Sequence, residues 1–147
     1  MAIVIQNTCA DRLIDEKNLA QTLDQVLIDL GQGAAELLIR LVDKAEIQQL
    51  NHTYRHKNQT TNVLSFPSDL PIEINEAILG DVVICVDVVK EEAKVQNKAF
   101  DDHLIHMAIH GTLHLLGYDH IKDSEAEVME NLEIKILEKM KIANPYA

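Results

Sequence analysis

Aromatic residues are scarce in this sequence. They make up 3% of its 147 residues, and tryptophan is missing altogether. The core must therefore be packed mainly from leucine, isoleucine, valine and alanine. Hydrophobic residues amount to 47% and charged residues to 25%, which is typical of a soluble globular domain and argues against disorder. A chain of this length suits one compact domain, and we expect that domain to span residues 1–147.

Cysteine and long apolar runs are also scarce. Cys9 and Cys85 are the only cysteines and are not in C-x-x-C spacing, so we expect two buried free thiols in a reducing compartment. Apolar runs such as residues 82–86 are far too short to cross a membrane. No basic segment followed by an apolar stretch opens the chain, so we expect a cytoplasmic protein with no signal peptide and no membrane contact.

Positive charge is in deficit. The sequence has 13 basic and 24 acidic residues, a formal net charge of -11. This negative charge disfavours broad, sequence-independent binding to nucleic-acid phosphates. If the substrate is a nucleic acid, recognition must be local or must depend on a partner.

The spacing of apolar residues predicts about four strands and about five helices in mixed order. This order favours an α+β fold, a roughly four-stranded mixed sheet with helices packed on it. Residues 58–62 are predicted to form a loop, and residues 70–76 an irregular segment. The predicted strands are residues 2–6, 36–42, 63–66 and 80–86. The predicted helices are residues 16–30, 44–54, 88–96, a segment from Asp101 or Asp102 to about 116, and a last helix from Ser124.

The ends and faces of these helices give further predictions. Gly31 and Gly117 are expected to end helices, because glycine takes up positive φ easily. Asp101 or Asp102 is expected to be an N-cap, and Ser124 with Glu127 matches a capping box. The buried stripe of the last helix is predicted to consist of Val128, Leu132, Ile136 and Met140.

Three of the seven histidines lie at His110, His114 and His120. On a helix, His110 and His114 project from one face, and a turn at Gly117 brings His120 back toward them. The spacing H-x3-H-x2-G-x2-H is that of the zinc ligands of metzincins. Three imidazoles with an open fourth position are typical of catalytic zinc, although nickel, cobalt or iron would also suit them.

Neighbouring residues leave alternatives open. His106 is one turn before His110 and is a competing ligand, although a structural or supporting role is the simpler interpretation. Asp119 is a candidate fourth ligand or proton acceptor, or it stabilises a turn. Gly111 stands where peptidases with the H-E-x-x-H motif carry their catalytic glutamate, so ordinary peptidase chemistry is disfavoured.

At these residues the sequence resembles the YbeY family of bacterial ribosomal-RNA maturation factors, which are regarded as metal-dependent endoribonucleases. The family signature HGxLHLxGYDH matches residues 110–120 at every fixed position. Many relatives have aspartate where this chain has Asn62, and glycine where it has His56. The other matching stretches are Asn51-x2-Tyr54-Arg55, Thr61-x-Val63-Leu64-Ser65-Phe66-Pro67, Leu79-Gly80-Asp81, Met129-Glu130, Ile136-Leu137 and Pro145-Tyr146.

The resemblance implies a single α+β domain in which His110, His114 and His120 hold one zinc-like ion in a cleft. It also implies that Arg55 faces this cleft and is needed for activity. The implied activity is cleavage of single-stranded ribosomal RNA, in maturation of the 16S rRNA 3′ end and in ribosome quality control. The implied partners are ribosomal RNA and the ribosome or a ribosomal protein.

The basic loop after residue 52 supports this interpretation independently. Arg55 and Lys57 are the only acidic or basic side chains, histidine aside, between residues 52 and 67, and guanidinium binds phosphate in a bidentate way. We expect Arg55, Lys57 and Ser65 to line the substrate cleft. Two alternatives stay open: a metal-dependent hydrolase of another class, such as a peptidase or amidase, and a non-catalytic ribosome-assembly factor with a structural metal.

Overall fold

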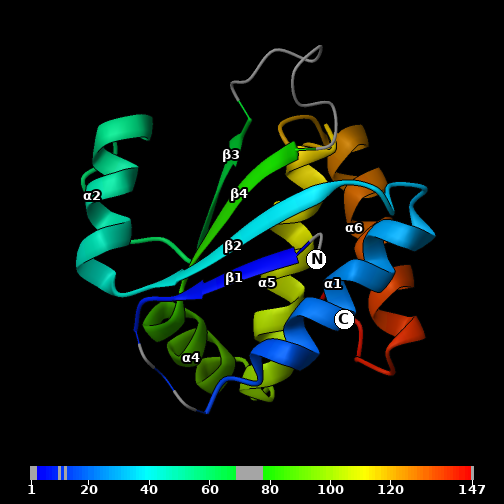
Figure 1. Cartoon of the computed structure of the whole chain (residues 1–147), viewed down its shortest axis with the longest axis horizontal. Coiled ribbons are helices and arrows are strands. Elements are labelled where there is room, and N and C mark those ends of the chain that lie inside the picture. Colours follow the sequence, from blue (N-terminus) through cyan, green and yellow to red (C-terminus); the bar gives the residue numbers. More distant parts are fainter. Residues whose placement is uncertain (1–2, 10, 12, 69–77, 147) are drawn as a thin grey trace.

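Four strands form one mixed sheet in the computed structural model, which describes residues 3–9, 11, 13–68 and 78–146 (Figure 1). The strand order is β1-β2-β4-β3. The first three strands in that order are parallel, and β3 pairs antiparallel with β4 at one edge. The strands are β1 (Ile3–Asn7), β2 (Glu36–Val42), β3 (Val63–Pro67) and β4 (Ile78–Cys85).

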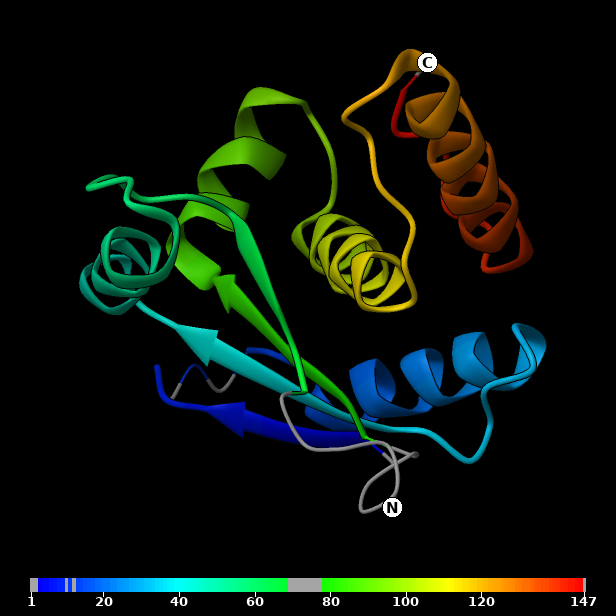
Figure 2. The same cartoon turned by 90° about the horizontal axis from the view of Figure 1, so that it is seen from above.

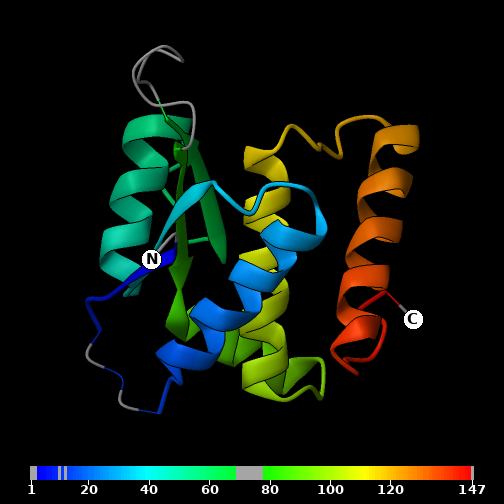
Figure 3. The same ribbon diagram turned by 45° about the vertical axis from the view of Figure 1, so that its right-hand side comes forward.

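Helices cover both faces of this sheet (Figures 2 and 3). One face packs against α1 and α5 in the larger core cluster, and α6 lies on the far side of α5. The opposite face packs against α2, where Ile47 lies in a smaller apolar cluster with Leu64 and Val83. The described helices are α1 (Glu16–Asp29), α2 (Lys44–Arg55), α4 (Val86–Val95), α5 (Phe100–Leu115) and α6 (Asp123–Lys139).

The predicted fold class is confirmed, because the described residues form a four-stranded mixed sheet and five helices. Each described element lies within two residues of its predicted bounds, and residues 58–62 form the expected loop. The segment predicted to be irregular, residues 70–76, lies outside the described residues. None of the helices in the described ranges is both long enough and apolar enough to cross a membrane.

Helix α5 is the central helix of the fold, since it lies between the sheet and α6 (Figure 3). Ten of its sixteen residues are buried, including His103 and His106. The predicted aspartate N-cap is wrong: Ala99 occupies that position, and Asp101 and Asp102 lie within the first turn. Their carboxylates still interact favourably with the positive end of the helix dipole.

Helix α6 differs from its prediction in two respects. It begins after Lys122, which makes no side-chain cap, so the capping box predicted at Ser124 is wrong. The predicted buried stripe is also partly wrong, because Val128 is 58% exposed and Met129 is buried in its place. The prediction failed because the buried residues of α6 include a glutamate, and hydropathy alone would place a glutamate on the surface.

The two cysteines are free, as predicted. Cys85 is buried at the end of β4, and burial raises the pKa of its thiol. Cys9 is only half-buried, so the prediction of burial is wrong for that residue.

Candidate metal centre

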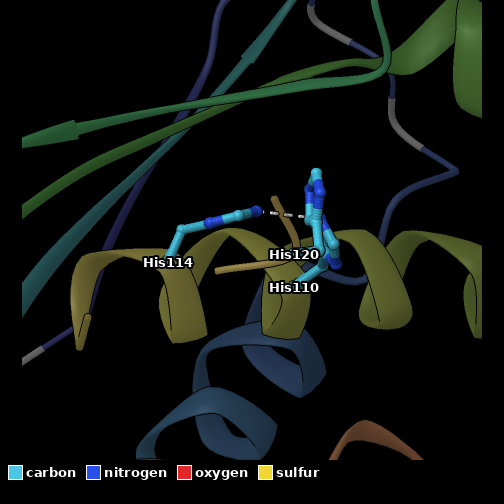
Figure 4. Close-up of side chains that lie close together, drawn as sticks. All are labelled: His110, His114 and His120. Atoms are coloured by element: carbon cyan, nitrogen blue, oxygen red, sulfur yellow. Dashed lines mark hydrogen bonds between the residues drawn. The ribbon is translucent and has the colours of Figure 1, made fainter. Parts of the chain in front are cut away.

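The three histidines of the sequence motif meet at the C-terminal end of α5 (Figure 4). His110 and His114 lie one turn apart, and their ring centroids are 4.7 Å from each other. His120 stacks on His110 at 5.5 Å and lies edge-on to His114 at 4.9 Å. One nitrogen of each ring falls within 4.8 Å of the other two.

The turn that returns His120 is formed at Gly117. Its φ is +101°, in the region that favours glycine. Gly117 N–H donates to the carbonyl of His114 and Tyr118 N–H to that of Leu113, both at 3.0 Å, the pattern of a Schellman motif. The predicted helix end at Gly117 is therefore confirmed, and this backbone geometry positions His120.

Glu133, in the middle of α6, was not predicted as part of the site. Its carboxylate is fully buried, and Oε1 accepts a hydrogen bond from His110 Nδ1 at 2.6 Å. A proton held on Nδ1 leaves the lone pair of His110 on Nε2, which lies 3.1 Å from Nε2 of His114. Glu133 therefore sets the tautomer of His110 and aims its free nitrogen at the cluster.

Three donors converge on the Glu133 carboxylate. His106 Nε2 donates to Oε2 at 2.7 Å and the Tyr146 hydroxyl donates to the same oxygen at 2.6 Å, in addition to His110 on Oε1. Burial raises the pKa of Glu133, but hydrogen bonds from His106, His110 and Tyr146 outweigh it and lower the pKa to about 2. The carboxylate is therefore ionised and acts as a fixed negative charge behind His110.

The arrangement of nitrogens fits a cation. Two imidazole lone pairs facing each other at 3.1 Å repel unless a proton or a cation lies between them. Ligand nitrogens on tetrahedral zinc are separated by about 3.3 Å, given Zn–N distances of roughly 2.0–2.1 Å. Burial, with smaller contributions from His110 and His120, lowers the pKa of His114 and so favours the neutral form that binds metals. The three-histidine group is therefore compatible with metal binding.

The competing ligands do not join this group. His106 is buried and is bound to Glu133, which agrees with the supporting role that we expected. Asp119 accepts a hydrogen bond from the backbone N–H of His120 at 2.7 Å, so it stabilises the turn. Over the described ranges, no carboxylate or thiol lies with the three imidazoles as a fourth ligand.

Gly111 is glycine because α5 packs closely on the sheet at this position. A Cβ here would lie 2.6 Å from Val82 Cγ1 and 3.1 Å from Ser65 Oγ. The Ser65 hydroxyl also donates to the Gly111 carbonyl at 2.9 Å, which fixes the helix to β3. The fold therefore has no room for a glutamate at the position where peptidases carry their base.

All the side chains predicted to form the site line one cleft of about 630 Å³. Its lining includes Arg55, Lys57 and Ser65 together with the three histidines. Arg55 Nη2 donates to the Ser65 carbonyl at 2.7 Å, so its guanidinium lies along the open edge of β3. Asn62 also lines the cleft and donates to Glu92 at 3.2 and 3.3 Å.

His56 follows Arg55 and ends α2 in the left-handed region, with φ of 59° and ψ of 30°. This conformation costs a non-glycine residue roughly 1–2 kcal/mol.

We therefore expect His56→Gly to raise the free energy of unfolding by about 1 kcal/mol. Urea unfolding at constant m-value measures the change. The matched control His52→Gly, inside the same helix, should lower it by about 1 kcal/mol; a loss of stability in both variants would contradict the strain.

Taken together, the fold and the cluster define an α+β protein with a three-histidine site in an open cleft. A model of the family described as endoribonuclease YbeY matches residues 4–141. The chain belongs to this family.

Individual relatives agree with this assignment. The endoribonuclease YbeY of Ruthia magnifica is 60% identical over 98% of this chain and 99% of its own length. The Pseudomonas syringae pv. tomato protein of the same name is 59% identical over 77% of this chain and 69% of its own. A solution structure of a Thermotoga maritima protein superposes with a TM-score of 0.64 at 26% identity, covering 95% of this chain and 91% of that one.

Proposed function

We propose that this chain is a metal-dependent endoribonuclease that cleaves single-stranded ribosomal RNA in a single domain spanning residues 1–147. It would act in the cytoplasm, in maturation of the 16S rRNA 3′ end and in ribosome quality control. The observation that carries the proposal is the shared cleft, which is lined by an arginine and by three convergent imidazoles, in a chain whose relatives are named endoribonucleases.

His110, His114 and His120 would hold the ion, and zinc suits three neutral imidazoles best, with nickel or another transition metal as the alternative. When bound, such an ion supplies Lewis-acid polarisation of the scissile phosphodiester. The chain's own contribution begins with Glu133, which holds the proton on Nδ1 of His110 and keeps that ring oriented. Gly111 and Ser65 fix α5 against β3, the strand to which Arg55 is also hydrogen-bonded.

Arg55 is the residue we assign to the phosphate. One guanidinium nitrogen is bound to the Ser65 carbonyl, and the group lies 5.4 Å from the centre of the Phe66 ring. This support pre-organises the remaining N–H groups to donate to phosphate oxygens as negative charge grows in the transition state. Lys57 adds positive charge to the same cleft, and the Ser65 hydroxyl oxygen is placed to accept a hydrogen bond from the substrate.

Replacing Arg55 tests this assignment. Arg55→Ala should lower kcat/KM for single-stranded RNA by about 100-fold or more, as removal of a transition-state donor does, and Arg55→Lys by about tenfold, because charge is kept but the planar fork is lost. Steady-state cleavage assays, with thermal unfolding to confirm the fold, measure both. An alanine variant that cleaves within twofold of the parent would remove Arg55 from the mechanism.

A panel of substrates tests the reaction class itself. The parent protein should cleave single-stranded RNA and leave peptides and amides intact. The cleft lacks the peptidase glutamate, and the close packing around Gly111 leaves no space for one. Peptide cleavage without RNA cleavage would reject the proposal in favour of the other hydrolase class. Metal binding without cleavage of either would favour the assembly factor.

We also propose that the ribosome or a ribosomal protein presents the RNA, because a net charge of -11 weakens binding to naked RNA. Cleavage should therefore be more efficient on precursor ribosomal particles than on the same RNA after extraction. Equal efficiency on both substrates would remove the need for a partner.

A further inference from the structure

A second cavity, of about 770 Å³, lies on the α2 side of β3. Arg55 and Pro67 line both this cavity and the histidine cleft, so the two hollows meet at the edge of the sheet. Ser65 and Phe66 show the same division, because they are successive strand residues whose side chains point to opposite faces. Ser65 lines the histidine cleft and Phe66 the second cavity.

Tyr54 is the exposed aromatic of this second cavity. It lies at the end of α2 and is 59% exposed, which is unusual for so large a ring in a protein with few aromatics. Its ring packs edge-on against Phe66 at 5.3 Å, and the guanidinium of Arg55 lies 5.4 Å from the same Phe66 ring. Across the described residues, no hydrogen bond engages the Tyr54 hydroxyl. The ring is thus held in place by a neighbour while much of its surface faces solvent.

The charges of the cavity favour one part of a nucleotide over another. Glu46 and Asp81 line it, and Arg40, its other basic residue besides Arg55, is bound to Glu46 at 2.6 Å. Carboxylates repel a phosphate but tolerate an uncharged base. Arg55, at the junction with the histidine cleft, keeps N–H groups that can donate to a phosphate. A nucleotide with its phosphate at Arg55 would therefore turn its base toward Tyr54.

We propose that Tyr54 is a stacking platform for an unpaired base next to the scissile phosphate, so that single-stranded RNA crosses the β3 edge at Arg55. The inference rests on the proposed function and adds a path for the substrate on this chain. Aromatic stacking of a splayed base is a common basis for recognising single-stranded RNA. It needs no net positive charge, which suits so acidic a protein.

The test compares Tyr54→Ala, Tyr54→Leu and Tyr54→Phe in binding and cleavage of a short single-stranded RNA oligonucleotide. Loss of one stacked base should weaken oligonucleotide binding about tenfold in the alanine and leucine variants, whereas the phenylalanine variant keeps its ring and stays within about twofold of the parent. The kcat/KM for the same oligonucleotide should fall by a similar factor in the alanine and leucine variants. Leucine retains contact with Phe66, so it separates stacking from packing.

A second readout does not depend on cleavage. Oligonucleotides with a single 2-aminopurine, bound in the presence of chelator, should show quenched fluorescence at one position in the parent and in Tyr54→Phe, but not in Tyr54→Ala. Val95→Ala, a truncation at a side chain that is 86% exposed on α4, is the control and should not change binding. Unchanged affinity in Tyr54→Ala, equal weakening in Tyr54→Phe, or no quenching at any position would overturn the inference. If the parent binds and quenches without cleaving, the proposed function fails and the stacking site stands.

Discussion

His114→Ala is expected to lose bound metal and RNA cleavage together. His114 is one of the three histidines that we propose as ligands, and its Nε2 lies 3.1 Å from that of His110. Two remaining imidazoles cannot complete the site, and several kcal/mol of transition-state stabilisation would be lost with the ion, about 1,000-fold or more in kcat/KM. Elemental analysis and RNA cleavage by the same preparation measure the two effects.

The control for this experiment is His52→Ala. His52 is an exposed histidine near the end of α2, away from the cluster, and its removal should leave metal content and cleavage unchanged. Cleavage at the parent rate by metal-free His114→Ala would separate the reaction from the cluster. Retention of stoichiometric metal by that variant would show that the ion binds elsewhere.

Glu133→Gln is expected to weaken metal binding and to destabilise the fold. The substitution keeps the volume of the side chain but removes the charge that receives hydrogen bonds from His106, His110 and Tyr146. We expect metal affinity to fall about 10- to 100-fold, as for other residues that orient a metal-ligating histidine. Three donors, of which His106 is buried, would share a poorer acceptor, so the free energy of unfolding of the metal-free protein should fall by about 1–3 kcal/mol.

Metal affinity and stability have to be measured separately for this variant. Competition with a chelator at a temperature where the protein is folded gives the affinity, and urea unfolding gives the stability. Glu138→Gln, on an exposed face of the same helix, should change neither. If Glu133→Gln is destabilised but binds metal as tightly as the parent, Glu133 is a structural residue and does not position His110.

The sequence was sufficient to predict that the three histidines meet, because their geometry is local. The i, i+4 spacing of His110 and His114 follows from the helix period, and Gly117 marks the place where the chain turns back. The fold class was also accessible, since the apolar periods of strands and helices are clear along the chain. The order of strands depends on long-range pairing, so the edge position of β3 had no local signal.

Glu133 escaped prediction for a physical reason. It lies on a helix with many acidic residues, and a single buried carboxylate cannot be distinguished from its exposed neighbours by type or spacing. Its burial is favourable only because three donors from two other segments reach it. One signal was present: Met129, Glu133, Ile136 and Leu137 share a helix face, so a glutamate interrupts an otherwise apolar stripe.

The helix starts were mispredicted because short polar side chains were read as caps wherever they preceded an apolar run. Helix α5 begins at Phe100, before the aspartate that was predicted to cap it, and Phe100 packs against the core. Tertiary packing thus decided the boundary over the capping preference of Asp101. At the end of α2 a non-glycine residue, His56, takes up the αL conformation that glycine usually has at such a position.

The most direct measurement is a reconstitution experiment on the parent protein. Metal is removed with a chelator, and zinc, nickel and other divalent ions are then added back while bound metal and RNA cleavage are followed together. The chelated protein should stay folded but inactive, and cleavage should return in proportion to one bound ion per chain. Full cleavage by protein shown to be metal-free, or activity that returns without occupancy of the three histidines, would contradict this prediction.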